Sequence, residues 1–281
     1  MKIGVFYMPT SYSVDPASMA RHLESRGFDS LWLPDHPIIP VEQNTPYPGE
    51  GEMPDYYGHL MDPFIALAAA ATATTRLELG TGVALIPERN ALVTAKEVAT
   101  LDRVSGGRFQ FGIGAGWLKE EGEIMGAVWK RRWSQTRELM LAMKACWTQE
   151  QAEFHGEYVD FPKLYSDPKP VQQPHPPILI AGELAKVGDR IVEYGDGWIP
   201  RYIKTSPADI AKTRKEMEQR FREAGRDFSR FEIVVFGCKP DREEHKRLED
   251  AGADRVVQML RVASPEKTLE RVDIWADTLV A

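Results

Sequence analysis

The residues best suited to chemistry lie where predicted strands end. Asp35 and His36 follow the strand-like run Phe28–Leu33, and His36 is, of the six histidines, the one directly beside a strand end. An imidazole gives or takes a proton near neutral pH, and a neighbouring carboxylate can orient it or raise its pKa. We therefore expect His36 to be catalytic, with Asp35 as its partner.

Glycines end two further strand-like runs, Leu77–Val83 and Arg108–Ile113. Backbone without Cβ atoms at the carboxyl ends of strands leaves room for a flat group to lie close, although barrel curvature alone would also explain such glycines. The candidate binding residues at these ends are Gly80, Thr81, Gly82, Val83, Gly114, Ala115, Gly116 and Trp117.

The elements that must position these residues alternate regularly. Strand-like runs cover 3–8, 28–33, 77–83, 108–113, 178–181, 197–200, 231–236 and 255–260. Helical patterns follow them at 15–26, 62–75, 92–101, 134–147, 183–194, 206–224, 240–250 and 265–278. This alternation predicts a parallel α/β sheet, either closed or doubly wound.

Eight such units predict a closed (β/α)₈ TIM-like barrel, as one domain over 1–281. Insertions are expected after strand 2 (38–59), after strand 4 (118–132) and before strand 5 (154–177). A doubly wound Rossmann sheet is the alternative, but Trp117 stands where its fingerprint needs a third glycine.

In a barrel the active site lies at the carboxyl ends of the strands. That rule adds three residues after strand 5 and two at strand 6, namely Ala181, Gly182, Glu183, Gly197 and Trp198. The first three open a helix, whose backbone N–H groups attract phosphate. Lys186 and Arg201 are cations close enough in sequence to meet an anionic cofactor tail, although most such cations are solvated surface.

Composition narrows the partners. The net charge is −7, which argues against a nucleic acid or an anionic membrane as partner. The two cysteines have no metal-binding spacing, and we expect no catalytic metal. No run approaches the ~20 apolar residues of a membrane span, so a cytoplasmic protein acting on a small molecule is expected.

Six motifs together resemble the luciferase-like monooxygenase superfamily, and most closely its branch of coenzyme F420-dependent oxidoreductases. In order they are PDH, LELGTGV, LDRVSGGR, FGIGAGW, PKPVQQPHPPI and GDGW. The resemblance implies a TIM-like barrel with a tricyclic ring resting against strand 3, and a non-proline cis peptide between Gly82 and Val83. It also implies that the histidine of the Asp-His pair lies near the ring, and that the chain forms a homodimer through helices next to strands 2 to 4.

One position departs from a known branch of this superfamily. Sugar-phosphate dehydrogenases carry a glutamate proton donor where this chain has Trp117, which argues against sugar-phosphate oxidation. Either an apolar wall beside the ring or an ordinary core aromatic explains the tryptophan. Tyr47, Tyr56 and Tyr57 of the 38–59 insertion form either a lid over the ring or loop filler.

The resemblance therefore implies an oxidoreductase that passes hydride between F420 and a small organic substrate. The alternative within the superfamily is an FMN-dependent monooxygenase that uses reduced flavin and oxygen. The alternative outside enzymes is a barrel that binds the cofactor without turnover.

Overall fold

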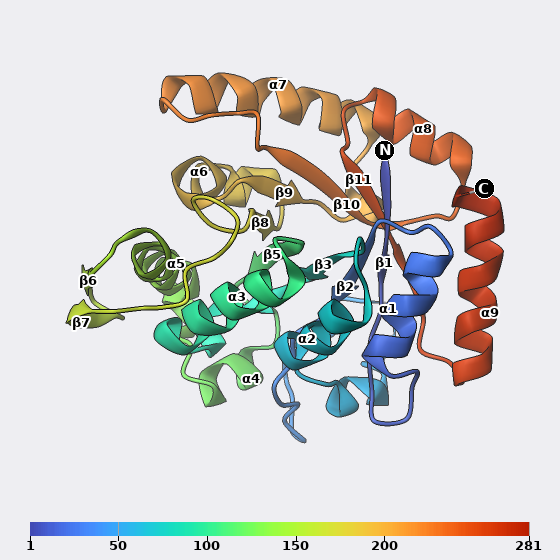
Figure 1. Cartoon of the computed structure of the whole chain (residues 1–281), viewed down its shortest axis with the longest axis horizontal. Helices are drawn as coiled ribbons and strands as arrows, with labels where there is room; N and C mark the ends of the chain where they lie inside the picture. The colour runs from blue at the N-terminus through green and yellow to red at the C-terminus, as the bar shows by residue number, and fades with distance from the viewer. Residues whose placement is uncertain (50, 281) are drawn as a thin grey trace.

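Eight strand positions close into a parallel barrel in the computed structural model, which describes residues 1–49 and 51–280 (Figure 1). The strands are β1 (Lys2–Phe6), β2 (Ser30–Leu33), β3 (Glu78–Thr81), β4 (Ala84–Leu85), β5 (Phe109–Gly114), β8 (Ile178–Ala181), β9 (Gly197–Ile199), β10 (Glu232–Cys238) and β11 (Arg255–Met259). β3 and β4 occupy one position, interrupted at 82–83, and both pair with β5. Neighbouring strands run from β3 through β1 and β11 to β5, and every pairing in this ring is parallel. The predicted barrel is confirmed.

Helices cover the outside of the barrel, as Figure 1 shows. They are α1 (Pro16–Ser25), α2 (Pro63–Ala73), α3 (Ala91–Ser105), α4 (Lys119–Ile124), α5 (Arg132–Thr148), α6 (Leu184–Tyr194), α7 (Pro207–Glu223), α8 (Arg242–Asp250) and α9 (Pro265–Trp275). Side-chain caps fix where several begin: Asp15 accepts from the Ser18 N–H and Asp62 from the Ile65 N–H. α3 ends at Gly106, whose φ of 68° is left-handed and favours glycine.

The insertions contain structure that the sequence patterns did not predict. α4 lies in the insertion after the fourth barrel position, and an antiparallel hairpin of β6 (Ala152–His155) and β7 (Asp160–Leu164) lies before the fifth. The 38–59 insertion holds a 3₁₀ turn, Asp55–His59, and its residue 50 lies outside the described residues.

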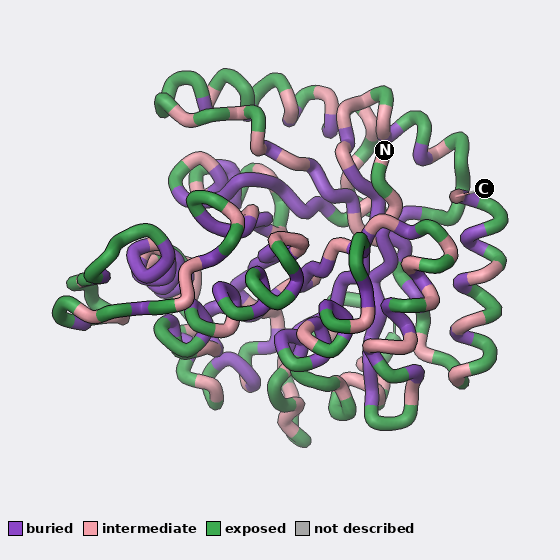
Figure 2. Tube along the Cα trace, viewed as in Figure 1, coloured by how far each residue is buried: buried purple, intermediate pink, exposed green. Residues whose placement is uncertain are grey.

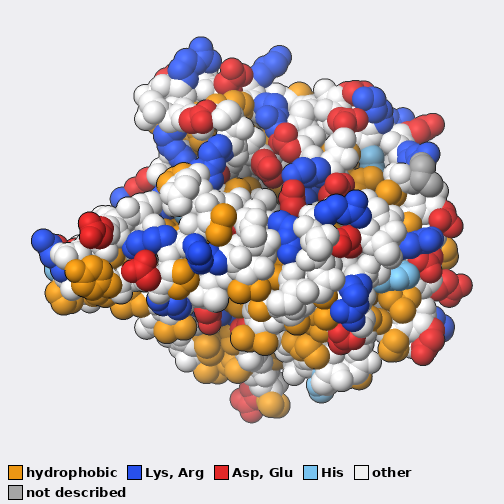
Figure 3. Space-filling view, in the orientation of Figure 1, with side chains coloured by type: hydrophobic (Ala, Val, Ile, Leu, Met, Phe, Trp, Pro, Cys, Tyr) orange, Lys and Arg blue, Asp and Glu red, His pale blue; other side chains and the backbone are white. Residues whose placement is uncertain are grey.

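Burial follows the barrel, with the strands and the inner faces of the helices buried (Figure 2). One cluster fills the barrel interior and includes Phe6, Trp32 and Val257; a larger one lies between strands and helices. The surface mixes charges of both signs, while hydrophobic side chains gather along the lower edge of the view in Figure 3. Among the described residues, no helix is long and apolar enough to cross a membrane.

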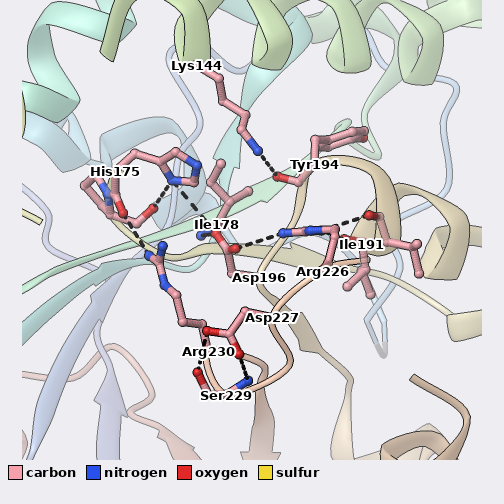
Figure 4. A network of polar contacts seen from close by, with 12 residues as sticks. Lys144, His175, Ile178, Ile191, Tyr194, Asp196, Arg226, Asp227, Ser229 and Arg230 are labelled. Atoms are coloured by element: carbon pink, nitrogen blue, oxygen red, sulfur yellow. Dashed lines mark hydrogen bonds and ion pairs between the residues drawn. The ribbon is translucent and has the colours of Figure 1, made fainter. Parts of the chain in front are cut away.

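A polar network ties the amino-terminal ends of three strand positions together (Figure 4). Asp196, just before β9, accepts the N–H of Ile178 at 3.0 Å and the Arg226 guanidinium at 3.1 Å. Arg230 donates to the carbonyl of His175 at 3.0 Å. These contacts hold the end of the barrel that lies opposite the carboxyl ends of the strands.

Candidate active site

A cavity of about 900 Å³ opens at the carboxyl end of the barrel. Ten of the predicted binding residues lie in its wall: Gly82, Val83, Gly114, Ala115, Gly116, Trp117, Ala181, Gly182, Glu183 and Trp198. The strand ends predicted to meet on one rim do meet there. The predicted cis peptide bond between Gly82 and Val83 is also confirmed.

Three predicted residues do not reach the cavity, because they are packed within the barrel wall. A Cβ on Gly80 would lie 2.2 Å from the Trp32 ring, and one on Gly197 would lie 2.5 Å from the carbonyl oxygen of Glu232. The hydroxyl of Thr81 donates to the carbonyl of Gly112 at 2.7 Å. For Gly80 and Gly197, close packing in the barrel is the reason for a residue without a Cβ.

The cavity has an apolar half and a charged half. At the barrel mouth, glycine backbone alternates with apolar side chains, among them Val83, Ile199 and Phe236. Such a wall suits the face of a planar ring. An apolar ring face can cover it without leaving a polar side chain of the wall unpaired. The start of α6 lies between the halves, where Gly182 and Glu183 lead into the first helical turn.

The charged half lies toward α7. Its cations are Arg201, Lys204, Lys212 and Arg220, and they alternate with carboxylates of the same wall, as where Lys204 lies 3.5 Å from Glu183. Arg201, one of the two cations that the sequence suggested for an anionic cofactor tail, therefore lines the cavity. Lys186 does not: it pairs with Glu183 at 2.8 Å on the exposed surface.

His36 lies behind Trp117 and is held from both sides. Its Nδ1 lies 2.7 Å from Oε2 of Glu121, and its Nε2 lies 3.3 Å from the indole Nε1 of Trp117. The carboxylate accepts and the indole N–H donates, so both contacts suit a neutral imidazole with its proton on Nδ1. The side chain is 7% exposed, and His36 does not itself line the cavity.

Asp35 does not orient His36, and that prediction is wrong. Its carboxylate makes two contacts of 2.7 Å with the Arg89 guanidinium and accepts the N–H of Leu85 at 3.0 Å. The geometry of an arginine fork matches both carboxylate oxygens, which turns Asp35 away from its sequence neighbour. Glu121 of α4 takes the place that was expected for Asp35.

The predicted tyrosines form an aromatic cluster in front of His36. Ring centroids lie 5.3 Å apart for Tyr57 and His36, 5.7 Å for Tyr47 and Trp117, and 5.2 Å for the stacked pair Tyr56 and Tyr57. Burial raises the pKa of Tyr57 well above its usual value, so the phenol stays neutral. Of these aromatic residues, Trp117 lines the cavity, and the three tyrosines pack behind it around His36.

Glu121 and Glu88 are the residues that the sequence patterns missed. Glu121 is fully buried, and Glu88 is 3% exposed. Burial raises the pKa of Glu88 to about 9, with the charges of Glu121 and Asp35 adding to the effect. In the sequence, Glu121 lies within the polar run 119–123, which gives no signal of burial.

The cavity lies at the carboxyl end of a closed parallel barrel, which is where barrel enzymes hold their active sites. The chain belongs to the luciferase-like monooxygenase family, whose model matches residues 13–250. It is 34% identical over 287 residues to an uncharacterized protein of Mycobacterium tuberculosis, covering 100% of this chain and 98% of that one.

The chain matches relatives that catalyse two kinds of reaction, reduction and monooxygenation. It is 26% identical to 5,10-methylenetetrahydromethanopterin reductase of Methanolobus tindarius, over 96% of this chain and 74% of the reductase. It is 33% identical to an FMNH2-dependent dimethylsulfone monooxygenase of Pseudomonas putida, over 46% of this chain and 36% of that enzyme. The relatives therefore include a reductase and an FMNH2-dependent monooxygenase.

Solved structures share the whole fold. A monooxygenase of Streptomyces bottropensis superposes with a TM-score of 0.77 at 20% identity, covering 100% of this chain and 99% of that one. An F420-dependent tetrahydromethanopterin reductase of Methanopyrus kandleri superposes with a TM-score of 0.75 at 16% identity, covering 99% and 98%. These likenesses establish the closed (β/α)₈ barrel.

Proposed function

We propose that this chain is an F420-dependent oxidoreductase that transfers hydride between the deazaflavin and a small organic substrate. The observation that carries the proposal is the two-part shape of the cavity. An apolar, glycine-walled mouth continues into a charged half that holds Arg201, Lys204, Lys212 and Arg220. A cofactor with a planar ring and a long anionic tail suits both halves.

The protein residues would divide the work between holding and proton transfer. The glycine-tipped strand ends from Gly82 to Gly116 would bear the ring, and the start of α6 with the cations toward α7 would hold the tail. When bound, F420 supplies the carbon that accepts or donates hydride. Nε2 of His36 takes the proton of a substrate hydroxyl or returns it, while Glu121 holds Nδ1 and stabilises the imidazolium.

A second candidate is an FMN-dependent monooxygenase. The apolar side chains at the cavity mouth, among them Trp117, favour it, because excluding water protects a reactive reduced flavin from side reactions. The match to the dimethylsulfone monooxygenase supports it as well. FMN has a short phosphate tail, however, whereas the charged half of the cavity extends as far as Lys212 and Arg220 of α7.

Titration of the purified chain with F420 and with FMN, followed by ring fluorescence, tests the proposal. We expect micromolar binding of F420 and none of FMN. Lys212→Glu and Arg220→Glu variants should weaken F420 binding about ten-fold or more, while Lys215→Glu, on exposed surface of α7 outside the cavity, should not change it. Binding of FMN alone would select the monooxygenase, and binding of F420 without turnover on any donor would select a non-catalytic barrel.

A further inference from the structure

The charged half of the cavity is a groove between two neighbouring helices, α6 and α7. α7 lies beside α6 on the outside of the barrel (Figure 1), and side chains of both helices line the groove. Charged residues of α7 follow one another there at intervals of three or four, and so share one face of the helix: Asp209, Lys212, Glu216 and Arg220. Arg220 lies about 20 Å along α7 from Pro207, at the rise of an α-helix. A ligand that starts at the barrel mouth must therefore be long to reach it.

The guanidinium of Arg220 crosses the groove and rests against α6. Its Nη2 lies 2.5 Å from Oδ1 of Asp189. A Cβ on Gly188, the residue before, would lie 2.6 Å from Nη1 of Arg220. Glycine inside a helix is less favourable than alanine, and this close approach gives Gly188 a packing reason. The backbone of α6 thus provides a seat for the guanidinium at the point where Asp189 holds it.

Two contacts keep Arg220 in the groove without the help of Asp189. One is the seat at Gly188, and the other is Glu216, one turn earlier on α7, whose carboxylate lies 3.5 Å from Nη1 of Arg220. The side chain of Asp189 is 99% exposed. An ion pair with a partner so exposed contributes little to stability, because water replaces the lost contact. Asp189 can therefore release Arg220 easily, and the released guanidinium stays where it is.

The cations of the charged half fall into two kinds. Arg220 is already paired, and so is Lys204, whose Nζ lies 3.5 Å from Glu183 at the start of α6. Arg201 and Lys212 form no ion pair with any residue that the structure describes. An anionic ligand therefore finds two cations ready to bind it, and two that carboxylates of the protein already hold.

We propose that Asp189 is a positioning residue that occupies Arg220 while the groove is empty, and that an anionic cofactor tail binds by taking Arg220 from it. The inference rests on the proposed role of the charged half as the seat of such a tail. A carboxylate or phosphate needs two N–H groups of the arginine fork, and Asp189 holds one side of that fork. An anion that reaches only Arg201 or Lys212 does not meet this competitor. Asp189 therefore lowers the affinity for long anionic tails, and it does so through Arg220.

A double-mutant cycle separates this competition from simple repulsion between Asp189 and an anion. Binding of inorganic tripolyphosphate and, separately, of F420 is measured by calorimetry in the unaltered chain, Asp189→Asn, Arg220→Gln and the double variant. We expect Asp189→Asn to tighten binding about three-fold, as for release of an exposed ion pair, and to have no effect in chains that carry Arg220→Gln. Glu193→Gln removes the same charge from α6 outside the cavity, so this matched control should leave binding unchanged.

The cycle has clear contrary outcomes. An equal gain from Asp189→Asn with and without Arg220 would show repulsion alone, and unchanged or weaker binding in Asp189→Asn would show that the carboxylate does not compete; either result overturns the inference. Coupling with tripolyphosphate in a chain that does not bind F420 would refute the proposed function and leave the inference intact. Binding of F420 without coupling between the two residues would support the proposed function and refute the inference.

Discussion

At the scale of single residues, both ring nitrogens of His36 are occupied by hydrogen bonds to protein side chains. Trp117 donates to Nε2, the nitrogen that would meet a substrate hydroxyl, while Glu121 fixes the proton on Nδ1. A substrate O–H can replace the indole N–H as the donor to Nε2, because both present one hydrogen to the same lone pair. The aromatic cluster would then have to move aside, which is the role of a lid.

Replacing His36 by asparagine should separate catalysis from binding. The amide of asparagine still donates to Glu121, but it cannot take a proton. We expect turnover with F420, on a substrate identified by screening small alcohols and aldehydes, to fall by about 10²–10⁴-fold. The dissociation constant for F420 should change by less than about three-fold, since His36 does not line the cavity. Unchanged turnover would exclude His36 as the acid–base group, and His155→Asn, at the exposed end of β6, is the control.

Replacing Asp35 by alanine should act on stability. Its side chain is 1% exposed and its loss leaves the Arg89 guanidinium, itself 11% exposed, without its main partner. Breaking such a buried pair costs about 3–5 kcal/mol, which denaturant unfolding would measure. Asp62→Ala, which removes the more exposed partner of Arg89, should cost much less. A stable Asp35→Ala chain without turnover would instead restore Asp35 as a catalytic residue.

Sequence reasoning located the candidate site but not all of its partners. The ends of the strands could be predicted, because hydrophobic runs and glycines are local signals. The partner of His36 could not, since Glu121 stands 85 positions away and only the closed barrel brings the two together. Glu88 carries no local signal at all: its burial depends on how α3, α4 and the strand ends pack around it.

At the scale of elements, the barrel was predictable and the insertions were not. Each barrel strand carries its own apolar run, whereas α4 is six residues long and contains a glycine. A helix so short is not stable by itself and depends on tertiary contacts, here the burial of Glu121 against His36. The β6–β7 hairpin likewise interrupts a stretch whose prolines indicate irregular backbone.

The network at the amino-terminal end of the barrel should make stability depend on pH (Figure 4). Burial lowers the pKa of His175 from 6.5, and Lys144 and Arg230 lower it further, while Asp196 opposes them. The folded chain therefore keeps His175 neutral, and below pH 6.5 the unfolded chain binds the proton that the folded one refuses. Stability contributed at neutral pH is lost as the pH falls.

His175→Asn should remove this part of the acid sensitivity. The asparagine amide can still donate to the carbonyl of Pro176, which Nδ1 contacts at 2.9 Å. We expect the variant to lose stability less steeply below pH 6.5, by up to about 1.4 kcal/mol per pH unit. Denaturant unfolding at pH 5 to 7.5 measures the slope, with exposed His59→Asn as control. Equal slopes in all three chains would contradict the assignment.

At the scale of the whole molecule, the two ends of the barrel have different tasks. Ion pairs and backbone contacts fix the amino-terminal end, whereas the carboxyl-terminal end holds a cavity, a neutral carboxyl group and a histidine held by an aromatic side chain. Side chains that a site needs for catalysis are not placed for the greatest stability of the folded chain. The opposite end can compensate without altering the site.

We predict a homodimer from the exposed apolar side chains on the outer face of α2, α3 and α4. Ile65, Val93 and Ile124 are 74%, 55% and 65% exposed there, and hydrophobic side chains gather along the lower edge of Figure 3. Covering several large apolar side chains with a second copy removes them from water at about 25 cal/mol per Å².

Light scattering of the purified chain should therefore give twice the 31.7 kDa mass of one copy. Ile65→Asp combined with Val93→Glu should produce monomers, because each change places an unpaired charge in the buried interface. Ile274→Asp on α9, also exposed, lies away from this face and should leave the dimer intact. If the unaltered chain is a monomer at micromolar concentration, the apolar face has another occupant. If the double variant stays dimeric, the copies meet through a different surface.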